Sequence, residues 1–190
     1  MLVFGDDQTV FRRLPTQHYS ASGGPEAPTR VIQRFDVRLS TRSRQTVRRD
    51  YDFEHPSLRL QDSASIEPAH RLEDYRYPAG FTGHVRGAQL ARRGLERHRS
   101  DRHRVLGRSD QPLLRSGHFL ELQDHPDPSC NDLWLITSVR HEGYQPQVLE
   151  EAGVDAERFQ GYRNRFTAIP WRSTYRPPLK HPKPTINGSQ

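Results

Sequence analysis

The chain of 190 residues contains one cysteine and no apolar run long enough to span a membrane. A single thiol excludes an internal disulfide framework and a zinc site built from thiolates. Cys130 lies in a segment of turn composition, so we expect a free surface thiol. The first residues lack the basic start and long apolar stretch of a secretory signal. We therefore expect that, if the protein leaves its cell, it does so without the general export route.

Apolar residues are also scarce. They make up 32% of the chain, against about 45–50% in ordinary globular domains on a count that includes glycine. The 13 glycines do not close this gap. A thin core buries little apolar surface, so chains of this type often depend on contacts with other subunits or with further parts of their own protein.

Lysine is nearly absent, because the only two are Lys180 and Lys183 in the tail. The formal charge of +6 therefore comes from arginine. This preference is typical of a genome biased toward arginine codons. It also suits interfaces, where the forked guanidinium pairs with carboxylates better than lysine does. Nucleic-acid binding is a third interpretation, but 23 acidic residues are interleaved with the basic ones and no nucleic-acid-binding signature is present.

Enzyme signatures are missing from the sequence. It has no Gly-x-Ser-x-Gly elbow, phosphate-binding glycine loop or dinucleotide fingerprint. The pair His141-Glu142 could hold a proton near neutral pH, but an exposed pair at the end of a strand is the commoner case. Nine aromatic residues could stack on a ligand, although packing between strands explains them more simply. They are Tyr51, Phe53, Tyr75, Tyr77, Phe81, Trp134, Tyr162, Phe166 and Trp171.

Two groups of histidines could suggest a metal. His98 and His103 are five residues apart among arginines, whereas ligands on a helix need spacings of three or four. A loop could gather a second group, formed by His118, Asp124, His125 and Asp127. We favour neither group as a ligand set. The sequence predicts no catalytic, cofactor-binding or metal site, and no enzyme activity.

Two segments have the composition of linkers. Residues 15–29 contain prolines and glycines among small polar residues, and residues 178–190 have no apolar periodicity. Since neither can bury apolar area, we expect both to be mobile, with unprotected amides in hydrogen exchange. Residues 62–70 have the composition of a domain boundary, and residues 144–160 that of an inserted connection.

Alternation of apolar and polar residues predicts strands over much of the remaining chain. The candidates are residues 31–39, 43–53, 71–77, 105–106, 118–122, 133–139 and 162–169. One helix is expected over residues 82–99, capped by Thr82. Its narrow apolar stripe would be Val85, Ala88, Ala91 and Leu95.

Gly87 and Gly94 would weaken this helix unless another backbone packs closely against it. We therefore expect the helix to lie on a sheet. The whole pattern predicts a mostly β structure with one principal helix, packed across a barrel or sandwich built from residues 71–170.

Five segments occur in an order that resembles one known family. They are residues 50–56, residues 75–78 with Gly80, and residues 86–96, 133–143 and 163–170. Their order and spacing resemble VgrG, the spike protein of bacterial type VI secretion systems, in the later part of its phage tail-hub-like region. The chain departs from that family at residues 124–130, where a glycine usually precedes the His-Pro pair.

The resemblance implies a mainly β fold with two small β-barrel or sandwich hub modules. Residues 1–61 would be the remainder of the first module, including a mobile loop at 15–29, because the start at Met1 looks abrupt. Residues 62–176 would be the second module, with the principal helix packed on it. Residues 177–190 would be a proline-rich linker toward an oligonucleotide-binding fold and a needle that this chain lacks.

The resemblance further implies a structural component of the type VI secretion spike. Three chains would form a hub that adapts a hexameric tube protein to the needle and carries effector proteins, with no chemical step. The protein would assemble in the bacterial cytoplasm and leave by the type VI route, without a membrane anchor or bound nucleic acid. The full protein would be a homotrimer, and this chain alone monomeric or weakly associated.

Three alternatives remain open at this point. The first is a tail-hub baseplate protein of a contractile phage or phage-like particle, which would share the fold. The second is a basic nucleic-acid-binding module. The third is a hydrolase with an unrecognised site.

Overall fold

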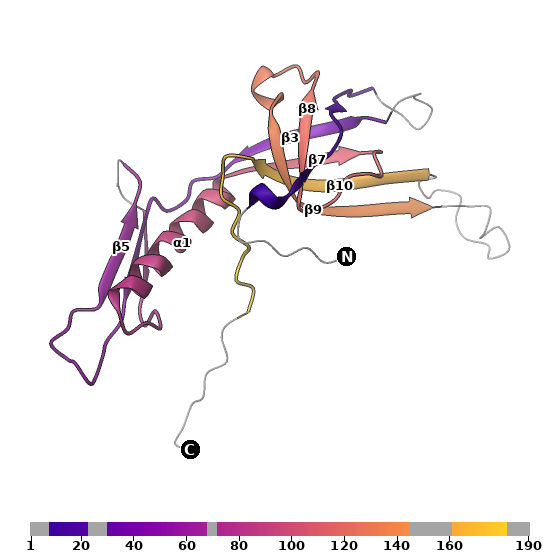
Figure 1. Ribbon diagram of the computed structural model, residues 1–190. Coiled ribbons are helices and arrows are strands. Elements are labelled where there is room, and N and C mark those ends of the chain that lie inside the picture. The colour runs from indigo at the N-terminus through magenta and orange to yellow at the C-terminus, as the bar shows by residue number, and fades with distance from the viewer. Residues whose placement is uncertain (1–7, 23–29, 68–71, 145–160, 182–190) are drawn as a thin grey trace. The chain divides into compact units, whose positions relative to one another are not determined.

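The computed structural model describes residues 8–22, 30–67, 72–144 and 161–181 (Figure 1). The chain divides into two compact units, and each draws on separate stretches of sequence. Unit 1 consists of Met1–Arg42 and Arg99–Thr174, and unit 2 of Ser43–His98 and Tyr175–Gln190. The segment Ser43–His98 of unit 2 is therefore inserted between the two segments of unit 1 in the sequence.

Unit 1 is built on one mixed sheet of seven strands. Its strands are β1 (Arg12–Arg13), β2 (Gln17–His18), β3 (Ile32–Leu39), β7 (His103–Ser109), β8 (His118–Gln123), β9 (Leu133–Tyr144) and β10 (Gly161–Pro170). Short 3-10 helices lie at Gln8–Val10 and Pro128–Cys130. The strand order is β1-β8-β9-β10-β7-β3, with β2 also on β8. The pairs from β8 through β9, β10 and β7 to β3 are antiparallel, whereas β1 and β2 run parallel to β8.

The sheet of unit 1 curls back toward its own edge. After β2, the backbone N–H of Tyr19 donates to the Gln123 carbonyl at 2.9 Å, and that of Ser20 donates to the Ile32 carbonyl at 3.0 Å. One isolated bridge, Tyr19 to Ile32, thus links the β2 side to β3. The described strands do not form a closed barrel. The predicted mainly β class with one principal helix is confirmed.

The core of unit 1 lies on one face of this sheet. Phe166 of β10, Gly107 of β7 and Phe35 of β3 are register partners. The Phe35 ring lies 5.1 Å from that of Trp134 and 6.3 Å from that of Phe166. A methyl group added at Gly107 would lie 2.0 Å from the Phe166 ring. The glycine therefore makes room for the Phe166 ring. This ring packs on β7 at Gly107 and lies near the Phe35 ring of β3, so it links β10 to both strands.

Unit 2 pairs a small sheet with the helix. Strand β4 (Gln45–Arg49) lies between β5 (Gln61–Ser65), which is antiparallel to it, and β6 (Glu73–Arg76), which is parallel. Helix α1 (His84–Arg102) begins in unit 2 and ends in unit 1, and Figure 1 shows it beside β5. The Thr46 hydroxyl of β4 donates to the Ala91 carbonyl of α1 at 2.7 Å.

The buried face of α1 differs from the predicted stripe. Ala91 and Leu95 are buried, as predicted, but Val85 is 89% exposed and Ala88 is also exposed. The buried position in that turn is Gly87, where an added methyl group would lie 2.2 Å from the Asp62 carboxylate and 2.5 Å from the Phe81 ring. Glycine has a low helix propensity and no side chain, so a search for apolar residues at helical spacing passes over it. In α1, Gly87 instead allows the helix to pack closely on Asp62 and Phe81.

The expected sheet against which α1 packs was placed too late in the chain. Helix contacts reach Thr46 of β4 and Asp62 of β5, which lie outside residues 71–170. The sheet and helix interpretation itself is correct. The division into modules 1–61, 62–176 and 177–190 stays a prediction.

Strands lie in two segments for which no strand was expected, the linker at residues 15–29 and the domain boundary at residues 62–70. Within residues 15–29, β2 pairs with β8, and Gln17 is only 4% exposed. Within residues 62–70, β5 pairs with β4. Neither strand shows an alternation of apolar and polar residues, so nothing in the sequence indicated them. Backbone hydrogen bonds to the neighbouring strand hold both in their sheets. Residues 23–29, 145–160 and 182–190 lie outside the described residues. The expected mobility of the first and last of these segments, and the expected inserted connection in the second, stay predictions.

Replacement of Gly107 by alanine should destabilise unit 1 by about 1–3 kcal/mol, because the new methyl group overpacks the Phe166 ring. Urea unfolding followed by tryptophan fluorescence measures this, since both tryptophans lie in unit 1. Gly143→Ala is the matched control in β9, where nothing lies within 4 Å of the new methyl group. Equal effects of the two substitutions would contradict the close approach described above.

Candidate functional site

Asp50 connects two of the segments that the sequence singled out. Its carboxylate accepts hydrogen bonds from the backbone N–H groups of Gly80, Phe81 and Tyr51, the last two at 2.9 Å. Gly80 has a φ of 75°, in the left-handed region that favours glycine. Burial acts to raise the pKa of Asp50, but these backbone donors prevail and hold the pKa below its ordinary value. The carboxylate therefore fixes the turn before α1 against the end of β4.

Beside this turn lies a groove of about 270 Å³. We call it the tyrosine groove, and its lining residues are Arg49, Asp50, Tyr51, Tyr75 and Tyr77. The three tyrosines are 52–56% exposed, and the nearby Phe53 in sequence is 80% exposed. Aromatic faces next to carboxylates suit a cationic side chain, because the ring quadrupole and the negative charge both attract it. The groove can therefore bind a guanidinium or ammonium group.

Just after Asp50 the loop carries more acid. The donor atoms of Asp52, Glu54 and His55 lie within 4.8 Å of one another, and no other set of metal-binding side chains is found among the described residues. His55 Nδ1 lies 3.1 Å from the Asp52 carboxylate. These side chains are mostly exposed, so they form a negative surface next to the groove rather than an enclosed metal site.

A partly buried network of charged side chains lies between the sheet and the helix of unit 2. Arg48, 8% exposed, donates to the Asp74 carboxylate at 2.7 Å, and His98 of α1 contacts the same oxygen at 3.0 Å. Burial acts to raise the pKa of Asp74, but Arg48 and His98 prevail and lower it. Gly94 leaves room for the Arg48 guanidinium, which an added methyl group would approach to 2.5 Å. This network ties α1 to β4 and β6.

On unit 1 the outer face of the sheet carries four arginines in register. Arg140 of β9 is the partner of Arg165 of β10, which is the partner of Arg108 of β7, which is the partner of Arg34 of β3. All four are exposed. We call this set the arginine row. A hollow of about 360 Å³ lies along it, lined by Arg34, Asp36, Arg38, Leu106, Arg108 and Arg165.

Carboxylates occupy the two ends of the arginine row. Arg34 Nε lies 2.6 Å from Asp36, and Arg140 Nε lies 3.3 Å from Glu142. Arg163 donates to Glu142 at 2.7 Å, and this bond is the main reason that the pKa of Glu142 lies below its ordinary value. Within the described part of the chain, no ion pair involves the two central arginines, Arg108 and Arg165.

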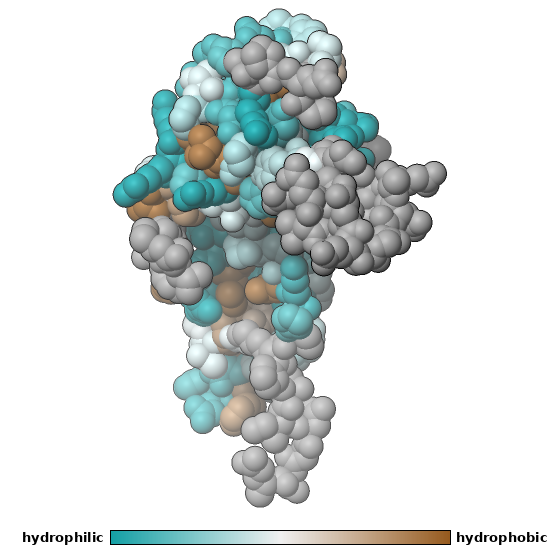
Figure 2. Space-filling model, turned by 90° about the vertical axis from the view of Figure 1, so that its right-hand side faces the viewer, coloured by the Kyte–Doolittle hydropathy of each residue, from teal (hydrophilic) through white to brown (hydrophobic). Residues whose placement is uncertain are grey.

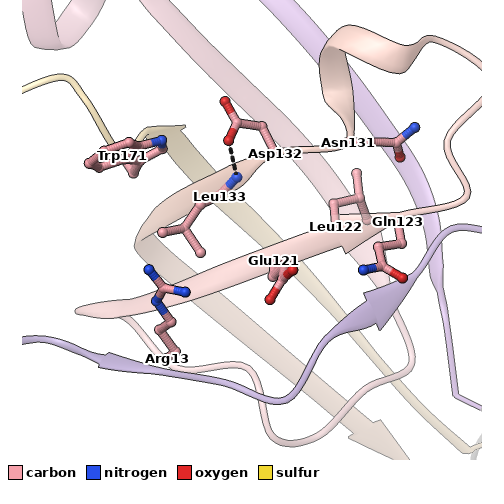
Figure 3. A pocket seen from close by; sticks show the side chains of 8 residues that line it. All are labelled: Arg13, Glu121, Leu122, Gln123, Asn131, Asp132, Leu133 and Trp171. Carbon is pink, nitrogen blue, oxygen red and sulfur yellow. Dashed lines mark hydrogen bonds between the residues drawn. The ribbon is translucent and has the colours of Figure 1, made fainter.

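A third hollow, of about 460 Å³, lies at the edge of unit 1 (Figure 3). Its lining comes from β1, β8, the connection to β9, the first residue of β9 and the residue after β10. The lining residues are Arg13, Glu121, Leu122, Gln123, Asn131, Asp132, Leu133 and Trp171. One carboxylate oxygen of Asp132 already accepts a hydrogen bond from the Leu133 N–H at 2.7 Å. The hollow offers charges of both signs, from Arg13, Glu121 and Asp132.

The structure separates the pair His141-Glu142. The His141 ring contacts the hydroxyl of Tyr162, whereas Glu142 pairs with Arg163 and Arg140. Consecutive residues of a strand point to opposite faces of the sheet. The two side chains therefore have separate partners. The expected position at the end of a strand is wrong, because both residues lie within β9 and pair with Asn164 and Arg163 of β10.

Neither of the two histidine groups considered from the sequence forms a set of metal-binding side chains among the described residues. His98 contacts Asp74 in unit 2, while His103 packs in unit 1 with its ring 5.5 Å from that of Trp134. His125 lies 4.5 Å from the Tyr19 ring, and its Nδ1 accepts from the Asp127 N–H at 3.0 Å. The absence of a metal or catalytic site stays a prediction.

Two sequence interpretations need correction. Cys130 is free, but it is 2% exposed rather than on the surface, and burial raises the pKa of its thiol. The turn residues around it are exposed, while the thiol faces the core beside Trp134, whose ring N–H donates to the Cys130 carbonyl at 2.9 Å.

Core packing also explains only part of the aromatic set. Phe81, Trp134 and Phe166 are buried. Five others are 39–80% exposed, namely Tyr51, Phe53, Tyr75, Tyr77 and Trp171. Tyr75 and Tyr77 are two residues apart at the end of a strand, and this spacing could have indicated a shared exposed face.

One face of the molecule carries mainly hydrophilic side chains (Figure 2). On the face shown in Figure 2, teal side chains cover most of the described residues, and apolar patches are scattered among them. A search of the described residues finds no helix with the length and apolar character needed to cross a membrane.

Comparisons with known proteins give a consistent picture. A family model described as phage tail baseplate hub (GPD) matches residues 1–147. The chain is 54% identical over 202 residues to the type VI secretion system spike protein VgrG4b of Pseudomonas aeruginosa, and 49% identical over 201 residues to VgrG5 of the same organism. Each comparison covers 100% of this chain and 25% of the relative.

A solved structure is also similar. The Escherichia coli c3393 protein, described as a component of the type VI secretion system with structural similarity to bacteriophage T4 tail proteins gp27 and gp5, matches with a TM-score of 0.53 and 21% identity. The match covers 96% of this chain and 33% of that one. The chain thus spans about a quarter to a third of the proteins that it matches. The resemblance predicted from the sequence is confirmed.

Replacement of Asp50 by alanine should destabilise unit 2 by about 1–3 kcal/mol, because the Gly80 and Phe81 N–H groups lose their acceptor. Urea unfolding followed by far-ultraviolet circular dichroism measures this through α1. Glu54→Ala removes a carboxylate from the same loop and should change the free energy of unfolding by less than about 0.5 kcal/mol. A similar loss in both variants would show that the carboxylate does not hold the turn.

His103 should make unit 1 less stable in mild acid. Burial and then Arg102 lower the pKa of its ring below 6.5, so the neutral form is favoured in the folded state. This contribution to stability is complete above pH 6.5 and is lost as the pH falls through the folded pKa. In urea unfolding followed by tryptophan fluorescence, His103→Leu should flatten the loss of stability below pH 6.5.

His181→Ala, which removes an exposed histidine outside unit 1, is the control for this experiment. It should leave the pH dependence of the wild-type chain unchanged. A His103→Leu chain with the same pH slope as the wild type would contradict the assignment.

Proposed function

Because the chain belongs to the phage tail baseplate hub (GPD) family, we propose that it is the hub segment of a type VI secretion spike. The observation that supports this most is the 54% identity to VgrG4b across the whole chain. Family membership gives the chain a structural role. The finer proposal is that three copies form a ring that adapts a hexameric tube to the needle and carries effectors.

The proposed mechanism is the transfer of load through protein contacts, without a chemical step. Unit 1 presents rows of charged side chains on one sheet face, and unit 2 presents exposed aromatic and acidic side chains. Surfaces of this composition suit contacts between subunits better than catalysis. A thin core in each unit agrees with this role, because an assembly supplies burial that the isolated chain lacks.

The proposed partners are two further copies of the chain, the hexameric tube protein and effector proteins. The protein would assemble in the cytoplasm and leave through the type VI apparatus, with neither a membrane anchor nor nucleic acid as a partner. The division into modules 1–61 and 62–176 and a linker at 177–190 belongs to this proposal.

A tail hub of a contractile phage or phage-like particle is the second candidate, because the matching family model describes a phage baseplate hub. Neighbouring genes for a secretion sheath or for a capsid distinguish the two.

The longer protein that contains this chain should be a homotrimer, and the chain alone should be monomeric or weakly associated. Light scattering on both measures this. In a strain that lacks the gene, the full protein should restore release of the tube protein into the medium, and deletion of residues 31–170 should abolish it. His141→Ala should retain release, since that side chain has no role in the proposed assembly. A full-length protein that is not trimeric would remove the spike proposal.

A further inference from the structure

We propose that the arginine row of one copy of this chain binds the tyrosine groove of a second copy. The contact would join unit 1 of one copy to unit 2 of its neighbour. This inference rests on the trimeric hub proposed above and names the residues that would hold it together. It follows from the two exposed surfaces whose chemistry is complementary, one cationic and one aromatic and acidic.

The inner part of the arginine row carries positive charge that no ion pair among the described residues neutralises, although Glu142 lies close enough to Arg165 for the two charges to interact. Neighbouring strands lie about 4.8 Å apart, so four register partners place four guanidinium groups along one line. Asp36 and Glu142 pair with the outer arginines. The inner two, Arg108 and Arg165, have no carboxylate within 4.0 Å among the described residues, and Leu106 lies half-buried beside them. The centre of the row therefore has capacity for carboxylates and flat apolar groups.

The tyrosine groove supplies both kinds of group. Tyr51, Tyr75 and Tyr77 present ring faces, and Asp52 and Glu54 follow in the adjoining loop. A guanidinium stacks on an aromatic ring with its plane and donates hydrogen bonds at its edge to a carboxylate. Tyrosine and arginine are also the residue types that contribute most binding energy at protein interfaces. The groove thus offers the inner arginines aromatic faces, with carboxylates in the adjoining loop, and Arg49 is the one cation in its lining.

A second copy fits better than another occupant. Both surfaces belong to the same chain, and a contact between two different surfaces is head-to-tail, which closes into a ring when the rotation allows. A ring of three is the proposed assembly. Nucleic acid would meet the Asp36 and Glu142 carboxylates at the ends of the row, which repel phosphate. It would also leave the tyrosine groove without a partner.

Two variants of the 190-residue chain test the contact. The row variant carries Arg108→Glu and Arg165→Glu, and the groove variant carries Tyr51→Ser and Tyr75→Ser. All four side chains are exposed, so both variants should fold, and circular dichroism checks this. Arg115→Glu and Val85→Ser are controls that change an exposed arginine and an exposed apolar residue elsewhere. Sedimentation velocity over concentrations up to about 1 mM measures self-association.

The wild-type chain and both controls should associate, and the association should weaken with added salt. Each variant alone should lose at least about tenfold in affinity. An equimolar mixture of the two variants should form a dimer and nothing larger, because it retains one intact row and one intact groove. Misfolding of either variant cannot produce this result.

Three outcomes would overturn the inference: no self-association of the wild-type chain, variants that associate like the wild type, or a mixture that stays monomeric. Binding of a labelled DNA duplex that the row variant loses, without self-association, would assign the row to nucleic acid instead. Light scattering on the full-length protein separates the two proposals. If the full-length protein is a trimer while the 190-residue chain does not self-associate, the hub proposal stands and this contact is wrong, whereas a full-length protein that is not trimeric removes the hub proposal.

Discussion

The packing of the Phe166 ring on Gly107 is the constraint on which unit 1 depends. A slip of one residue between β10 and β7 would place a side chain under the ring and would turn every apolar residue of the strand to solvent. Because Phe35 occupies the same row, the constraint extends to β3. The register that buries these rings also aligns Arg34, Arg108 and Arg165 on the opposite face. Core packing on one side therefore determines the charge pattern on the other.

Unit 2 relies on polar interactions to a greater extent. The Arg48–Asp74–His98 network and the Asp50 turn replace part of an apolar core, and each joins separate elements. A buried ion pair contributes little net stability, because desolvation costs about as much as the attraction returns. Its directional bonds nevertheless favour one arrangement of α1 on the sheet. The low apolar content of the sequence is consistent with a unit of this kind.

Strand alternation was sufficient to predict most of the large sheet. The expected strands at residues 31–39, 118–122, 133–139 and 162–169 fall in β3, β8, β9 and β10, except that Val31 lies just before β3. Part of β8, β9 and β10 is buried on both faces, as at Trp134 and Leu135. The same reasoning failed for β2 and β5, whose side chains give no pattern and whose backbone bonds supply the pairing. It also failed for the face of α1, where Gly87 makes the close contact.

Features that depend on which strands and loops lie side by side could not be predicted from the sequence alone. The arginine row exists only once the register of four strands is known, since Arg34 and Arg165 are far apart in sequence. Likewise, Asp50 and Gly80 were recognised in separate segments, and only the fold shows that one binds the other. The exposure of Tyr51, Tyr75 and Tyr77 was missed because aromatic residues in strands usually pack in a core.

The insertion of unit 2 between β3 and β7 has a consequence for how the chain folds. The first pairing of these strands joins Leu39 to His103, and the Ser40 N–H donates to the Arg102 carbonyl at 2.8 Å. To form it, an unfolded chain must close the loop of residues 40–102, at a cost in entropy that grows with loop length. If unit 2 folds first, most of that loop is already ordered and its conformational freedom has been lost beforehand. The central sheet of unit 1 would then nucleate through a much shorter effective loop, so the rate at which it forms would depend on the stability of unit 2.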